Sequence, residues 1–169
     1  MPVLETQRLV LREFQFEDLD ALAAILCDPE TMRYYPVSFD SAAVVDWIQR
    51  NRTRYANDGY GLWAMILKST RELIGDCGLV RQSVDAVDEI EIGYHVRRDL
   101  WNQGYASEAA RACRDYGFAN LNVDRLISLI RPENLASRRV AEKNGMTIWK
   151  KVTKVDLLHY VYAIERNQS

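Results

Sequence analysis

Residues 101–108 have the sequence Trp101-Asn102-Gln103-Gly104-Tyr105-Ala106-Ser107-Glu108 and connect a predicted strand to a predicted helix. The first amides of a helix have no internal acceptor and carry partial positive charge. A glycine at such a turn lets a ligand approach the backbone closely. The arrangement favours a phosphate or pyrophosphate. The spacing alone fits equally an ordinary strand-to-helix turn in which Gly104 serves only the conformation, so both interpretations stay open at this point.

The segments on both sides of this turn are strongly periodic. Ahead of it, apolar residues at 90, 92, 94 and 96 alternate with Glu91, Gly93 and His95, which predicts a half-buried strand. After it, a helix is predicted from about Tyr105 to Ala119. Its small residues form one stripe that would let the helix lie close to a sheet: Ala106, Ala109, Ala110, Cys113 and Gly117.

The remaining pattern predicts an α+β fold in a single domain, residues 1–169. Helical spacing places helices near residues 19–26 and 44–55, and another at Asn134 to Lys143 that ends at Asn144-Gly145. Residues 82–88 are predicted to form a polar, acidic loop. Strands are predicted at 9–12, 62–67, 73–80, 125–130, 147–155 and 157–164, besides the strand before residue 97. We therefore expect a mixed, mostly antiparallel sheet of about seven strands with helices on both faces.

The composition is that of an ordinary globular protein. Of the 169 residues, 48% are hydrophobic and 27% are charged, which excludes a largely disordered or fibrous chain. The formal net charge is −2, whereas a dedicated nucleic-acid binder usually carries a basic face. The longest uncharged apolar run, Leu62 to Leu67, is too short to cross a bilayer, and no signal-peptide core fits the N-terminus. We expect neither a nucleic-acid partner nor a membrane partner.

The cysteines and histidines predict a cytoplasmic protein without a metal site. Cys27, Cys77 and Cys113 are odd in number and lie far apart among apolar residues, which suits reduced thiols. The two histidines, His95 and His159, have no clustered cysteines beside them, so a protein metal site is not expected.

Several motifs, in order along the chain, resemble the GNAT N-acetyltransferase superfamily. Residues 101–106 fit its acetyl-CoA loop, Gln/Arg-x-x-Gly-x-Gly/Ala, with Trp101 in the place where the family often has Gln or Arg. The flanking Glu91-Ile92-Gly93-Tyr94 and the block from Arg131 to Met146 are also similar to family motifs. The opening Glu5-Thr6-Gln7-Arg8-Leu9-Val10-Leu11-Arg12 is similar to the RimJ/RimL type, which includes the ribosomal-protein N-terminal acetyltransferases.

The resemblance implies acetyl-CoA as co-substrate, no metal, and a cleft formed by splayed central strands. Backbone amides are expected to hold the pyrophosphate, at Gln103, Gly104, Tyr105, Ala106 and Ser107. The strand at Tyr94, His95 and Val96 is expected to pair with the pantetheine arm, whose two amides imitate a neighbouring strand. A bulge at Gly93 would splay this strand from its neighbour.

The resemblance also assigns roles on the next helix. Asn134 is expected to cap that helix, to touch the pantetheine, or to do both. Ser137, one turn later, is expected to face the cofactor. Many family members place a proton-donating Tyr where this chain has Ala141, so Ser137, Tyr94, Tyr160 and water remain as alternative donors to the leaving thiolate.

Glu91 is the candidate general base, because acetyl transfer from a thioester requires the amine to be neutral. The nearby acidic residues have two interpretations. Asp85, Asp88 and Glu89 could attract a cationic amine into the cleft, or they could form a solvated surface. For Asp85 and Asp88 the solvated surface is favoured.

These observations predict an N-acetyltransferase that moves an acetyl group from acetyl-CoA to a primary amine, either a protein N-terminus or a small molecule. The absence of the usual Tyr at Ala141 supports one alternative of another class, a catalytically inactive CoA-binding sensor or interaction module. The sequence leaves the identity of the acceptor open, and a homodimer is compatible with it.

Overall fold

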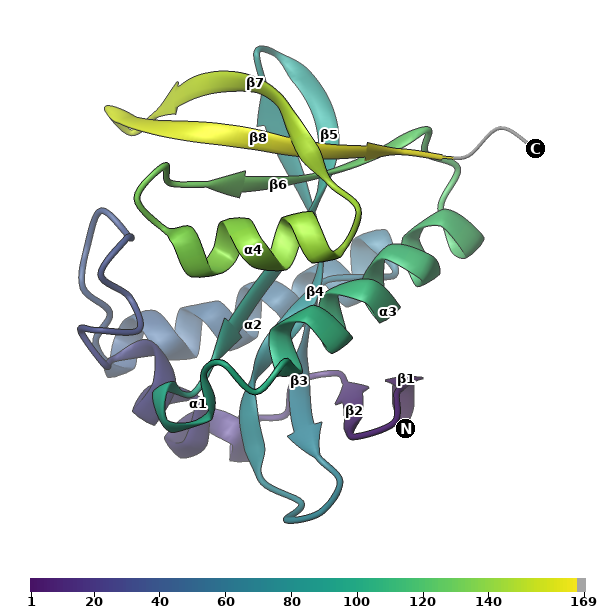
Figure 1. Cartoon of the computed structure of the whole chain (residues 1–169). Coiled ribbons are helices and arrows are strands. Elements are labelled where there is room, and N and C mark those ends of the chain that lie inside the picture. Colours follow the sequence, from purple (N-terminus) through teal and green to yellow (C-terminus); the bar gives the residue numbers. More distant parts are fainter. Residues whose placement is uncertain (167–169) are drawn as a thin grey trace.

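The computed structural model describes residues 1–166, in which an eight-stranded sheet is flanked by four α-helices (Figure 1). The strands are β1 (Pro2–Glu5), β2 (Leu9–Arg12), β3 (Leu62–Leu67), β4 (Leu73–Val84), β5 (Val87–Val96), β6 (Arg125–Ile130), β7 (Thr147–Lys154) and β8 (Leu157–Glu165). The helices are α1 (Leu19–Leu26), α2 (Ser41–Asp58), α3 (Tyr105–Asn120) and α4 (Leu135–Lys143). The predicted fold class is confirmed. None of the helices within residues 1–166 is both long and apolar enough to span a bilayer.

The strand order is β1-β2-β3-β4-β5-β6-β8-β7, and only β5 and β6 are parallel. These two central strands share a single paired position, Glu91 opposite Ile127. In Figure 1, β6, β8 and β7 form the upper part of the molecule and run across the direction of β3 and β4. The sheet therefore opens between β5 and β6.

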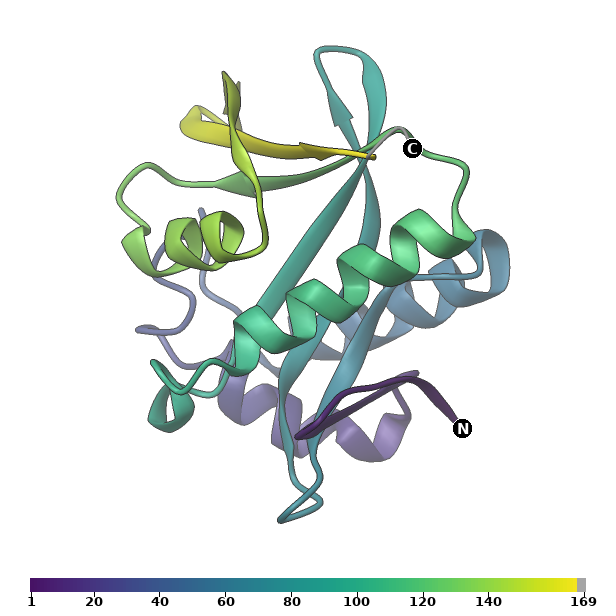
Figure 2. The same ribbon diagram turned by 45° about the vertical axis from the view of Figure 1, so that its right-hand side comes forward.

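The helices cover both faces of the sheet, α1 and α2 on one and α3 and α4 on the other (Figures 1 and 2). The stripe of small residues on α3 packs against the sheet as predicted, because Ala109, Ala110 and Cys113 are buried in one cluster with residues of β3, β4 and β5. At Gly117 an added Cβ would lie 3.0 Å from the side chain of Leu126. The thiols of Cys77 and Cys113 are free and lie 3.5 Å apart in this core.

Three expectations about the strands are wrong. Pro2–Glu5 forms an eighth strand, β1, which pairs with β2 at the edge of the sheet. Residues 82–88 are not a loop, because β4 and β5 continue to a two-residue turn at Asp85 and Ala86, both with positive φ. Within this hairpin Val84 is buried, whereas Asp85 in the turn and Asp88 on β5 are exposed.

The third correction concerns Gly93, where no bulge occurs. The pairing of β4 and β5 is continuous from Gly75–Val96 to Val84–Val87, and Gly93 lies opposite Gly78 within it. The opening of the sheet comes instead from β6, which leaves β5 after one paired position.

Candidate functional site

A cavity of about 780 Å³ lies where β5 and β6 separate. Residues of β5, β6, α2, α4, the segment 30–36 and the loop 100–107 line it. The cavity therefore collects residues from most of the chain, and the residues predicted to act in catalysis or in cofactor binding line it, except Gln103 and the alternative proton donor Tyr160.

The loop before α3 has the geometry of an anion-binding turn. Gly104 precedes α3 with φ of +83°, a left-handed conformation that favours glycine, and Asn102 is also left-handed with φ of +61°. The first helical hydrogen bond runs from the amide of Glu108 to the carbonyl of Gly104. Within residues 1–166, the amides of Tyr105, Ala106 and Ser107 have no hydrogen-bond acceptor. These three N–H groups are therefore free to bind an anion.

The opening stretch of the chain supports this loop, a connection that the sequence reasoning missed. The carboxylate of Glu108 accepts hydrogen bonds from the Thr6 hydroxyl at 2.6 Å, the Arg8 amide at 2.8 Å and the Arg8 Nε at 2.6 Å. Arg8 Nη1 also donates to the carbonyl of Gln103 at 2.9 Å, and its guanidinium lies 4.2 Å from the centre of the Tyr105 ring. Burial alone would raise the pKa of Glu108, but these hydrogen bonds lower it below its usual value. The opening motif and the loop motif thus form one structural unit.

The free edge of β5 has one main-chain position available to a ligand. The carbonyl of Ile92 accepts from the Ser128 hydroxyl at 2.8 Å, and that of Val96 accepts from the Trp101 indole at 2.7 Å. Because backbone groups alternate sides along a strand, the N–H and C=O of Tyr94 also point toward the opening. Trp101, the departure from the family pattern, therefore ties the loop to the end of β5.

On α4, Asn134 is the N-cap, as predicted, since its Oδ1 accepts from the amide of Ser137 at 3.1 Å. The carbonyl of Ser137 accepts from the Tyr94 hydroxyl at 3.0 Å, which holds α4 against β5. Both Asn134 and Ser137 line the cavity. By contrast, Ala141 is buried and, like Tyr160, is not among the lining residues, so neither position faces the cavity.

Glu91 lies at the point where β5 and β6 separate, and its carboxylate bonds across the opening. It accepts from Gln82 Nε2 at 2.6 Å and from the backbone amide of Leu129 at 3.2 Å. Burial raises the pKa of Glu91 above its usual value, although these hydrogen bonds and the charge of Lys154 act to lower it. A raised pKa near a cavity is a property of candidate general bases.

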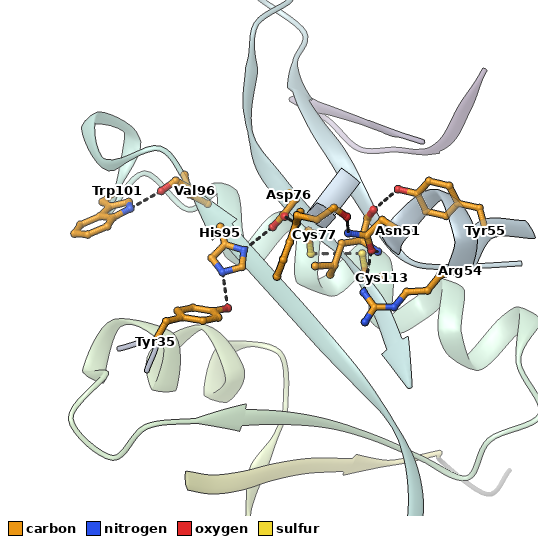
Figure 3. Close-up of polar contacts among 12 residues, drawn as sticks. Tyr35, Asn51, Arg54, Tyr55, Asp76, Cys77, His95, Val96, Trp101 and Cys113 are labelled. Atoms are coloured by element: carbon orange, nitrogen blue, oxygen red, sulfur yellow. Dashed lines mark hydrogen bonds and ion pairs between the residues drawn. The ribbon is translucent and has the colours of Figure 1, made fainter. Parts of the chain in front are cut away.

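A chain of hydrogen bonds runs beside the cavity, and Figure 3 shows its links from Asp76 through His95 to Tyr35. The indole of Trp47 donates to Asp76 Oδ2 at 2.9 Å, and the imidazole Nδ1 of His95 lies 2.7 Å from Asp76 Oδ1. The other ring nitrogen, Nε2, lies 2.5 Å from the hydroxyl of Tyr35. Asp76 is fully buried, whereas the residue Tyr35 is 40% exposed. Sequence reasoning missed Asp76 and the role of Tyr35, because their positions in the chain lie 41 residues apart and nothing local joins them.

The imidazole of His95 is thus held by Asp76 and Tyr35. The backbone carbonyl of His95 faces Gly75 of β4. The cofactor contact predicted for His95 stays a prediction, and it would have to use other atoms. Burial raises the pKa of the Tyr35 phenol, and the charges of Asp76 and Glu91 raise it further, so this hydroxyl stays protonated.

The acidic residues near β5 are paired at the surface or in the sheet and do not line the cavity. Lys150 contacts Asp85 at 2.6 Å, Arg81 contacts Asp88 at 3.5 Å, and Arg125 contacts Glu89 at 2.6 Å. The solvated-surface interpretation therefore holds for Asp85 and Asp88. Residues 1–166 contain no group of three His, Cys, Asp or Glu residues arranged to hold a metal ion.

Known proteins with related sequences include N-acetyltransferases. A family model described as an acetyltransferase (GNAT) domain matches residues 8–147. The chain is 36% identical over 140 residues to the N-acetyltransferase p20 of Bacillus licheniformis, and this alignment covers 81% of this chain and 78% of that protein. It is 40% identical over 152 residues to the protein YkkB of Bacillus subtilis, and this alignment covers 89% of this chain and 88% of that protein.

A solved structure shows the same arrangement of elements. A GNAT-family acetyltransferase from Bacillus anthracis superposes with a TM-score of 0.81 and 29% identity, covering 96% of this chain and 97% of that chain.

Proposed function

Since the chain belongs to the acetyltransferase (GNAT) family, whose members use acetyl-CoA, we propose that it acetylates a primary amine with Glu91 as general base. The acceptor is a protein N-terminus or a small-molecule amine, and the similarity of the opening motif to the RimJ/RimL type does not decide between them. The assignment of Glu91 as the base is supported by its position in the lining of the cavity.

The observation that carries the proposal is the alignment of two ligand sites along one cavity. Three free amides follow Gly104 at one end, and the main chain of Tyr94 is open along β5. The first suits a pyrophosphate, and the second suits the amides of pantetheine. A ligand that spans both sites would direct its thioester toward Glu91, which lies further along the same strand.

Glu91 would remove a proton from the attacking amine. The nitrogen lone pair forms a bond to the carbonyl carbon of the thioester, and the carbon–sulfur bond breaks with its electron pair on sulfur. Because its pKa is raised, Glu91 is a stronger base than an ordinary carboxylate.

The leaving thiolate needs a proton, and the usual Tyr is replaced by Ala141. We propose that Tyr35 takes this role together with His95 and Asp76. When the imidazole is protonated, the buried Asp76 carboxylate holds Nδ1–H, and Nε2–H donates to the oxygen of Tyr35. Tyr35 then passes its hydroxyl proton to sulfur and receives the proton from Nε2. The proton removed from the amine remains on Glu91 and returns to solvent.

A thiol-release assay with acetyl-CoA and a panel of primary amines tests the function. We expect turnover of at least one amine, and tight CoA binding with no turnover would support the inactive sensor instead.

The Glu91→Gln variant tests the base. We expect its kcat to fall by roughly 10²–10⁴-fold, the range for loss of a general base, with little change in the KM for acetyl-CoA. In the wild-type enzyme, kcat should fall as the pH is lowered through the raised pKa of Glu91, because the protonated carboxyl cannot act as a base. Glu91→Gln should lose this acid limb. Asp88→Asn, on the exposed side of the same strand, is the matched control and should retain both the rate and the limb. Full activity of Glu91→Gln at every pH would exclude Glu91 as the base.

A further inference from the structure

The cavity is basic although the chain as a whole is not. Among its lining residues, seven are Lys or Arg and three are Glu, whereas the whole chain has a formal net charge of −2. Two of the three glutamates are neutralised locally, because Glu30 contacts Arg33 at 2.6 Å and Glu133 contacts Arg131 at 3.4 Å. Only Glu91 remains without an ion-pair partner among the residues described. The cavity is therefore suited to a ligand with negative charge.

Two of the arginines lie together on α2. Arg50 and Arg54 are four residues apart, so they occupy the same face of the helix as Trp47. In residues 1–166 neither forms an ion pair with a carboxylate. Burial and the neighbouring charge of Arg50 lower the pKa of Arg54. Like charges at this spacing are unfavourable in an isolated helix, and an anion between them would relieve the repulsion.

The guanidinium of Arg54 is held in place by a buried side chain (Figure 3). Its Nη1 donates to Asn51 Oδ1 at 3.1 Å, and Asn51 is fully buried. Asn51 is itself fixed, because Oδ1 accepts from the amide of Leu62 at 3.0 Å and Nδ2 donates to the carbonyl of Trp47 at 3.0 Å. The remaining N–H groups of Arg54 are left for a ligand, in the fork geometry that matches a carboxylate or phosphate.

This site is separate from the loop at Gly104. Arg54 lies close enough to Glu91 for the carboxylate to influence its pKa, and Lys154 influences that of Glu91. Glu91 is five residues before the end of β5, about 16 Å from Val96 at the rise of a strand, and the loop lies beyond that end. The cofactor phosphates and the pair on α2 therefore occupy different ends of the cavity.

We propose that the acceptor is an amine that also carries an anionic group, a carboxylate or a phosphate, which Arg54 binds together with Arg50 while Lys154 adds positive charge. The inference rests on the proposed function, since it assigns the acceptor to the half of the cavity that holds Glu91. Binding of the anion by α2 would leave the amine of the same molecule directed toward the base.

Matched amines test this substrate class. Glycine against glycinamide compares a carboxylate with an amide, and phosphoethanolamine against ethanolamine compares a phosphate with a hydroxyl. We expect kcat/KM to be about tenfold or more higher for the anionic member of at least one pair, the factor that corresponds to one charged hydrogen bond. The Arg54→Gln variant should remove the preference mainly by raising the KM for the amine, with the KM for acetyl-CoA unchanged.

Arg111→Gln, at an exposed position of α3 outside the cavity, is the control and should keep the preference. Arg50→Gln serves as a second variant in case Arg54→Gln fails to fold. Equal turnover of charged and neutral members by the wild-type enzyme would overturn this inference and leave the acetyltransferase function intact. Failure to acetylate any amine, with CoA still bound, would overturn both.

Discussion

The Gly104→Val variant should weaken coenzyme binding strongly without unfolding the protein. Gly104 has φ of +83°, which is strained for a β-branched residue, at a cost of about 1–3 kcal/mol. The space itself is not the obstacle, since an added Cβ would meet only Arg8 Nη2 at 3.4 Å. The strain is relieved if φ becomes negative, and this change reorients the loop before Gly104 relative to the first turn of α3, so that the amides on the two sides of residue 104 no longer converge on one pyrophosphate.

The loss in affinity follows from the number of hydrogen bonds. A hydrogen bond to a charged group contributes about 1.5–3 kcal/mol, so the loss of even one corresponds to roughly 10–100-fold in the Kd for CoA. Isothermal titration calorimetry with CoA measures this directly. The same strain should lower the Tm by about 2–12 °C for a domain of this size.

Gly59 offers a matched control. It ends α2 with φ of +80°, an added Cβ there would meet nothing within 4 Å, and it does not line the cavity. Gly59→Val should therefore lose a similar amount of stability while it binds CoA as the wild type does. If Gly104→Val binds CoA with unchanged affinity, or if both variants lose affinity equally, the assignment of the loop is wrong.

Three further predictions concern the groups around the cavity. Tyr35→Phe should lower kcat by about 10²-fold with little effect on the KM for acetyl-CoA, because the phenol is the proposed proton donor. Steady-state kinetics measure this, and a wild-type kcat in the variant would exclude Tyr35 as the donor. Arg8→Met should weaken CoA binding several-fold and lower stability by about 1 kcal/mol, because Glu108 would lose its ion-pair partner and its charge would then repel the bound phosphates. Calorimetry and thermal melts measure both effects, and an unchanged Kd would show that Arg8 only braces the N-terminus. Asn134→Ser should retain the helix cap to Ser137, so a raised KM for acetyl-CoA at wild-type Tm would indicate contact with the pantetheine, whereas an unchanged KM would leave the cap as its only role.

The periodic segments were predictable because local sequence specifies them. Alternation identified β5, helical spacing identified α1 and α2, and Asn144-Gly145 marked the end of α4, where Gly145 has φ of +83°. The acidic composition of residues 82–88 hid the continuing strands, since charge at a solvated hairpin imitates a loop. β1 is short and pairs only at the edge of the sheet, so its residues carry little pattern.

The site was predictable only where a motif is contiguous. The loop at Gly104 and the cap at Asn134 belong to single stretches, and both line the cavity. The chain from Tyr35 through His95 to Asp76 unites a connecting segment with two strands, and the support of Glu108 by Arg8 spans 100 residues. Such contacts depend on the tertiary fold. The basic character of the cavity was likewise hidden, because the residues that create it are dispersed along an overall acidic chain.

The bonds between Arg8 and Glu108 couple the first two strands to the loop that precedes α3. Thermodynamic reciprocity requires that a ligand which orders this loop also secures β1 and β2, by the same free energy with which those strands favour the ligand. Neither strand lines the cavity, yet amide hydrogen exchange in both should slow when CoA is present. Protection of the N-terminal amides would thus report occupancy at a distance.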